Sequence, residues 1–190
     1  MTARLFAGAL FAVSLSARGV SAAPAETASN QAAKQNAISF EPLAILSRGF
    51  LIQYERLFGD RVSAVLGPGI RFAAREDFSS ETLVLHGEAR YWVARRELIS
   101  HEPGMVGPYA GLAIDLGRTS VRSLSQDRSL GAMLTLQESA RFGYRFVIFG
   151  FQEITPSFGV DLVHEFDEQG RLAATTRFTV SANLTVGWLF

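Results

Sequence analysis

The sequence predicts an all-β fold, an eight-stranded antiparallel up-and-down transmembrane β-barrel, and three observations lead to that class. Residues 177–190 alternate apolar and polar side chains with a period of two and end on an aromatic residue, Phe190. The same alternation recurs in almost every segment, behind a stretch that resembles a secretory leader. After that leader no run of about eighteen apolar residues occurs, although 48% of the chain is hydrophobic, so helical membrane spans are excluded.

The leader combines a basic start at Arg4, an apolar run from Leu5 to Leu15 that is too short to span a bilayer, and small residues before a cleavage position. Cleavage is expected after Ala22 or after Ala25. The chain therefore divides into a signal peptide at 1–22, a disordered periplasmic lead-in at 23–35 and a barrel domain at 36–190.

The composition excludes several classes of function. Without cysteine the chain has no disulfide, no thiolate nucleophile and no cysteine metal ligand. Its 18 basic and 18 acidic residues give a net charge of +0, which argues against nucleic acid as a partner. Lys34 is the only lysine, and the arginines suit bidentate pairing with carboxylates. We expect no cofactor and no metal, because none of the three histidines has metal-binding spacing.

Turn signals rich in Gly, Asp and Ser divide the domain into eight strands. The predicted strands are 36–46, 50–58, 62–74, 81–94, 108–122, 129–146, 151–166 and a last strand that begins near Arg171. Pro42, Pro68 and Pro156 lie inside these strands, so we expect bulges or shifted boundaries there. The connection at 95–107 is long for a periplasmic turn.

Alternation separates the two faces of the predicted strands. The inward face carries acids and arginines, namely Glu41, Glu55, Arg71, His86, Glu88, Arg90, Asp115, Arg141, Arg145, Glu153, Asp161 and Arg177. Eight strands enclose only enough width for side chains, so these charges should pair with one another or with trapped water, with Glu55 and Arg90 at the centre. This interpretation favours a filled polar core over an open pore. Apolar residues face outward, among them Phe50, Ile52, Leu83, Leu85, Leu112, Ile114, Leu134, Phe158, Val160 and Leu162.

Several short motifs suggest a family. They are the runs 37–43, 53–56 with 59–61, 90–92, 106–111, 143–146 and 186–190. Together they resemble a group of bacterial outer-membrane barrels, small relatives of the OmpA and OmpX type, that has no agreed activity. The resemblance implies an outer-membrane location and gives terminal Phe190 a role as a signal for the barrel assembly machinery. Phe190 could equally belong to an interfacial aromatic girdle that contains Tyr91, Tyr144, Phe146 and Trp188.

The function favoured by these features is a monomeric structural or surface-interaction protein, with outer-membrane lipid and the assembly machinery as its partners. One alternative is a lipid A-modifying enzyme, but the deacylase pattern His-x-Ser is absent because His164 is followed by Glu165 and Phe166. A second alternative is a soluble lipocalin-like binder, in which the outward apolar set would instead line a ligand pocket. The many glycines on the polar face favour a narrow polar interior over that arrangement.

Overall fold

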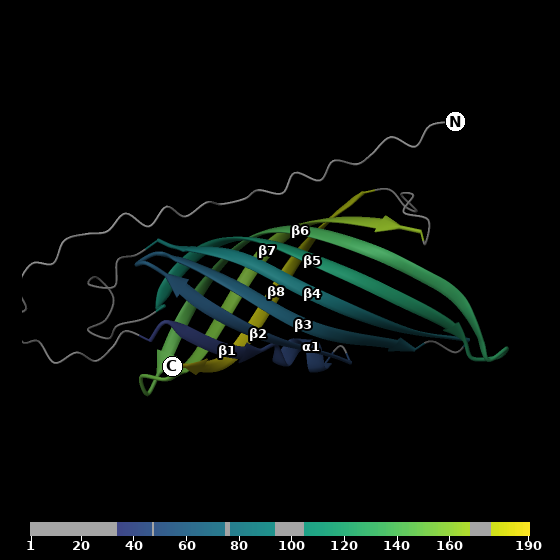
Figure 1. Cartoon of the computed structure of the whole chain (residues 1–190), viewed down its shortest axis with the longest axis horizontal. Coiled ribbons are helices and arrows are strands. Elements are labelled where there is room, and N and C mark those ends of the chain that lie inside the picture. The colour runs from purple at the N-terminus through teal and green to yellow at the C-terminus, as the bar shows by residue number, and fades with distance from the viewer. Residues whose placement is uncertain (1–33, 47, 75–76, 94–104, 168–175) are drawn as a thin grey trace, which may run out of the picture. The chain divides into compact units, whose positions relative to one another are not determined.

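The computed structural model describes residues 34–46, 48–74, 77–93, 105–167 and 176–190, and Figure 1 shows how their strands are arranged. The predicted signal peptide, both cleavage positions and all but the last two residues of the predicted lead-in lie outside these ranges. So do His101, most of the 95–107 connection and Arg171, the predicted start of the last strand.

Eight strands and one short helix follow one another along the chain. Their bounds are β1 Asn36–Phe40, α1 Pro42–Leu46, β2 Gly49–Phe58, β3 Val62–Ala74, β4 Phe78–Trp92, β5 Gly107–Ser123, β6 Arg128–Ile148, β7 Gln152–Phe166 and β8 Arg177–Leu189. Each strand pairs antiparallel with its neighbours in sequence and β1 also pairs with β8, so the strands form one ring-like sheet. The predicted all-β class, strand number and strand order are therefore confirmed. None of the described residues belongs to a helix long and apolar enough to cross a membrane.

The largest error in the predicted boundaries falls on the first strand. The strand expected at 36–46 stops at Phe40, and α1 occupies the rest. Pro42 explains the change, because it lacks the N–H that a strand interior needs and its fixed φ suits the first position of a helix. The Arg48 N–H then donates to the Ile45 carbonyl, 3.0 Å away, and the left-handed φ of Arg48, 59°, reverses the chain into β2.

Pro68 and Pro156 remain inside β3 and β7, and the bulges expected there are absent. Regular pairing of β2 with β3 is interrupted beside Pro68, and pairing of β6 with β7 is interrupted beside Pro156. The register is the same on both sides of each interruption. The missing proline N–H therefore removes some ladder pairs, but no extra residue is inserted as it would be in a bulge. The register shift between β5 and β6 lies instead at Val121 and Arg122.

The strands carry apolar side chains outside the ring and polar ones inside. Phe50, Leu112 and Phe158 expose 46%, 72% and 65% of their surface. The other outward residues predicted from alternation point the same way, whereas Glu55, Glu88 and Arg90 are buried. A lipocalin-like protein needs the opposite arrangement. The described outward residues therefore do not line the internal apolar pocket that this alternative requires.

A small apolar cluster lies inside the ring, at the end where β1 begins and β8 ends. Its buried members are Ala37, Trp92, Met105, Tyr109 and Leu189. The Trp92 and Tyr109 ring centroids lie 5.2 Å apart. Gly143 makes room for this packing, because a Cβ at that position would stand 2.4 Å from the Tyr109 ring. One end of the ring interior is thus packed with apolar side chains.

We predict that Gly143→Ala destabilises the folded protein by about 1–3 kcal/mol, the usual cost of overpacking a filled interior. The added methyl must displace the buried Tyr109 ring. The measurement is the free energy of unfolding in urea, and Gly87→Ala is the control because a Cβ at Gly87 meets nothing closer than 3.9 Å. Equal losses in the two variants would contradict the packing assigned to Gly143.

Candidate functional site

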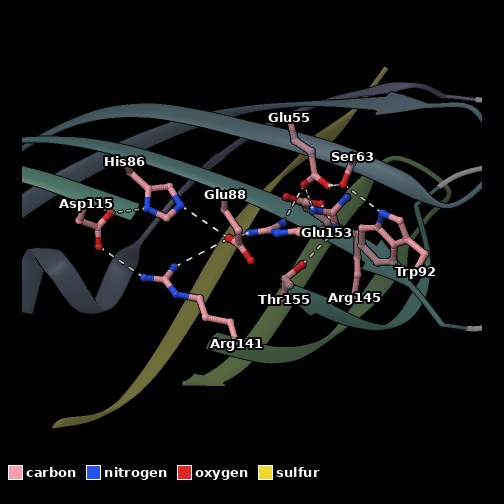
Figure 2. A network of polar contacts seen from close by, with 11 residues as sticks. Glu55, Ser63, His86, Glu88, Trp92, Asp115, Arg141, Arg145, Glu153 and Thr155 are labelled. Atoms are coloured by element: carbon pink, nitrogen blue, oxygen red, sulfur yellow. Dashed lines mark hydrogen bonds and ion pairs between the residues drawn. The ribbon is translucent and has the colours of Figure 1, made fainter. Parts of the chain in front are cut away.

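The candidate functional site is a set of charged side chains that are buried inside the ring, and Figure 2 shows them from close by. The strands β2, β4, β5, β6 and β7 each contribute at least one of them. Alternation is the local cause, because every second residue of a strand points to the same face. We call the residues Glu55, His86, Glu88, Arg90, Asp115, Arg141, Arg145 and Glu153 the interior charge network.

Glu55 on β2 is shared by two arginines from other strands. Its Oε2 accepts hydrogen bonds from Arg90 Nη1, at 2.7 Å, and from Arg145 Nη2. Its Oε1 accepts a hydrogen bond from the Ser63 hydroxyl of β3. Arg145 also lies 2.6 Å from Glu153 Oε2 through its Nε. Glu55 therefore joins β2, β3, β4 and β6 across the ring.

The second half of the interior charge network is centred on Glu88. Its Oε2 accepts a hydrogen bond from Arg90 Nη2 at 2.8 Å and lies 3.6 Å from His86 Nε2. His86 Nδ1 is 2.5 Å from Asp115 Oδ1. Arg141 faces both acids, with Nη1 3.8 Å from Glu88 and Nη2 3.5 Å from Asp115. Both ring nitrogens of His86 thus face carboxylates, and only the doubly protonated ring presents N–H groups to both.

Aromatic side chains connect the interior charge network to the apolar cluster. The Arg145 guanidinium lies over the Trp92 ring, 4.9 Å from its centroid, and the Arg90 guanidinium lies 4.7 Å from the Tyr109 centroid. Trp92 Nε1 donates to the Ser63 hydroxyl at 3.0 Å. Two arginines are therefore held both by carboxylates and by aromatic faces, which are favourable surfaces for a desolvated cation.

Four members of the predicted inward set lie outside the interior charge network, namely Glu41, Arg71, Asp161 and Arg177. Glu41 lies beside Asn183 and lines a cavity with Arg71. Asp161 is buried on β7 but accepts a hydrogen bond from Ser181 at 3.2 Å and not from an arginine of the network. Arg71 is exposed near the end of β3. Arg177 is paired at 2.9 Å with Glu165, with 63% of its side chain exposed, so its assignment to a lumen network is wrong. Both arginines sit near strand ends, where the ring no longer encloses them.

Sequence reasoning missed the neutral partners of these charges. Ser63, Trp92, Tyr109 and Thr155 all contact network residues. The signal that could have found Trp92 was its parity, because it lies two residues after Arg90 on the same strand. The distances across the ring carry no comparable signal in the sequence.

The four predicted girdle residues lie on the outside of the ring, near the last residues of the strands β4, β6 and β8. Tyr91 and Trp188 are about half exposed, and the Tyr144 and Phe146 ring centroids are 4.5 Å apart. The backbone of Phe190 exchanges two hydrogen bonds with Asn36, at 2.9 and 3.0 Å. The last residue is therefore fixed beside the first strand, while its side chain stays 55% exposed.

His164 has surroundings different from those of the interior histidine. Its Nδ1 lies 3.0 Å from the Thr176 hydroxyl at the exposed end of β7. Within the described ranges, no group of three or more histidine and carboxylate side chains is arranged to hold a metal ion.

A scan with protein-family models finds no match for this chain, and neither a search of curated proteins nor a search of solved structures finds a similar protein. The resemblance to small outer-membrane barrels therefore stays a prediction.

We predict that Arg90→Ala destabilises the protein by about 3–5 kcal/mol, because it leaves Glu55 and Glu88 buried without their shared cation. The measurement is the midpoint and slope of unfolding in urea, followed by tryptophan fluorescence.

The matched control is Arg122→Ala, which removes an ion pair with Asp127 in which both side chains are mostly exposed. That variant should unfold like the parent protein. An Arg90→Ala protein as stable as the control would contradict the inward assignment of this face.

Proposed function

We propose that this chain is a monomeric bacterial outer-membrane β-barrel with a structural or surface-interaction role, exported by a cleaved signal peptide, and that it is neither an enzyme nor an open pore. The observation that carries the proposal is an apolar outer surface around a polar interior that pairs with itself. An apolar outer surface is unfavourable in water, and polar side chains are unfavourable in contact with lipid. A membrane around the ring solves both problems, because lipid meets only the apolar surface and the polar side chains stay inside.

The outer surface supports the membrane assignment. Exposed large apolar side chains occur on all eight strands, for example Ile38, Leu66, Leu116 and Val180. A water-soluble monomer rarely exposes contiguous apolar patches of more than a few hundred Å². A ring-like sheet also suits the hydrocarbon layer, because most of its backbone groups pair between strands.

The interior supports a structural role over conduction. Tyr109, Trp92 and Met105 are nearly inaccessible to solvent at one end of the ring, and the interior charge network lies directly against them. A permeating ion would have to displace side chains that are held by several short contacts at once. Outer-membrane lipid and the barrel assembly machinery are the partners that this function requires.

We predict that the protein fractionates with outer membranes and migrates faster on a detergent gel before boiling than after it. The physical reason is that a lipid-embedded closed ring stays folded in detergent until it is heated. In planar bilayers the purified protein should give no steady conductance, and lipid A from expressing cells should have an unchanged mass. A soluble periplasmic protein without a gel shift would contradict the membrane assignment, steady conductance would contradict the filled interior, and altered lipid A would favour the enzyme alternative.

A second prediction separates the two roles of Phe190. Phe190→Ala should lower the amount of heat-shifting protein in cells but leave refolding into detergent micelles unchanged, because the side chain is 55% exposed and its backbone makes the contacts with Asn36. Trp188→Ala is the control, since it removes an outward aromatic of similar exposure two residues earlier. Equal losses in cells for both variants would indicate a girdle residue and no special assembly signal.

A further inference from the structure

The ring is closed along only a short seam between its first and last strands. Four residue pairs join β1 to β8, from Ala37 with Leu189 to Phe40 with Val186. Before Val186, the strand β8 pairs with β7 on one side, and no described strand pairs with its other side. This part of β8 is a sheet edge, and it faces the segment of β2 before Ile52, which β1 does not pair with either.

The helix α1 occupies the place that a longer β1 would fill. It packs against both β2 and β8, with Ala44 buried and with Ile45 and Leu46 exposed by 52% and 83%. Figure 1 shows α1 following β1 along the lower edge of the ring. The helix does not continue the strand ladder, so β8 has no strand partner beside it before Val186.

A cavity of about 490 Å³ lies where α1 meets β8. Its lining includes the polar residues Glu41, Arg71 and Ser80 and the apolar residues Leu43, Phe72 and Ala182. Its volume falls within the range of about 300–1,000 Å³ that is typical of small-molecule sites. The lining joins residues of β3, β4 and α1 to the free edge of β8.

The cavity lining carries one carboxylate, Glu41, and one guanidinium, Arg71, and no ion pair between these two described residues is formed. Glu41 can accept a hydrogen bond from the Asn183 amide, whose nitrogen lies 3.0 Å from Oε1 when the amide is oriented to satisfy both of its atoms. Arg71 makes no ion pair with the carboxylates of the described residues. A guanidinium without an ion pair, beside apolar side chains, suits an anionic oxygen group attached to an apolar chain.

We propose that this cavity binds one acyl chain with an anionic head group, a carboxylate or a phosphate. The head group contacts Arg71 and Ser80, and the chain lies along Leu43 and Phe72 and leaves the ring beside Ala182, at the free edge of β8. The exposed Ile45 and Leu46 extend the apolar path outward. The inference rests on the proposed membrane location for the supply of ligand, but binding itself can be measured in detergent.

The test uses the folded protein in a zwitterionic detergent and a fourteen-carbon fatty acid that carries a diazirine at the end of its chain. Illumination crosslinks the bound chain, and peptide mass spectrometry identifies the attachment sites. We expect saturable crosslinking to residues 41–46, 71–73 and 180–184, suppressed by an excess of unlabelled tetradecanoate. A lysophosphatidate with the same chain should compete if the source is a phospholipid, while a free-acid source predicts competition by tetradecanoate alone.

Two variants with matched controls test the assignment. Arg71→Gln should weaken binding roughly tenfold or more, the scale of one charge-assisted hydrogen bond, while Arg118→Gln on the exposed part of β5 should not. Ala182→Trp should block the exit of the chain, while Ala89→Trp on the outer face of β4 should not. Arg71→Gln leaves the wall intact, so it decides the question if the larger substitution prevents folding.

Three outcomes would overturn the proposal. They are crosslinks spread evenly over the outer surface, equal binding of a trimethylammonium compound with the same chain, and equal binding by Arg71→Gln and the parent protein. The heat-shift gel is run on every sample. A protein that shifts on heating but does not bind refutes the cavity assignment alone, while a protein that does not shift refutes the membrane function.

Discussion

A ring of eight strands encloses little more than the width of its own side chains, and this constraint governs everything placed inside it. Side chains that are distant in the sequence must meet across the ring, as Glu55 of β2 meets Arg145 of β6. Apart from the small apolar cluster at one end, the buried residues that the structure describes inside the ring are largely polar or charged. Each inward polar residue therefore depends on the partners that the opposite strands supply.

The apolar cluster and the interior charge network form one continuous packing unit. Trp92 belongs to the cluster, yet it donates a hydrogen bond to Ser63 and lies against the Arg145 guanidinium. The Tyr109 ring likewise belongs to the cluster and lies against the Arg90 guanidinium. It occupies the space that the missing side chain of Gly143 leaves. The glycines on the polar face are thus part of the electrostatic arrangement, because they decide where large rings can stand.

The sequence was informative where a property repeats along one strand and uninformative where it depends on two distant strands. Alternation placed Glu88 and Arg90 on the inside and Leu112 on the outside, and turn residues placed β3 within its observed bounds. The pairing of Glu55 with both Arg90 and Arg145 follows from strand order and register across the ring, which parity alone does not determine. Alternation also gave the wrong environment for Arg177. The side chain follows the inward direction of its strand, but it lies near the strand end and is exposed to solvent.

The short seam has a consequence for how the ring assembles. All other neighbouring strands follow one another in the chain, whereas β1 and β8 join residues about 150 positions apart, from Ala37 to Leu189. Bringing such distant segments together carries an entropic cost, and four residue pairs together with the Asn36–Phe190 hydrogen bonds compensate for it. We therefore expect β1 and α1 to dock last during folding and to exchange their amide hydrogens before the long central strands β4, β5 and β6 do.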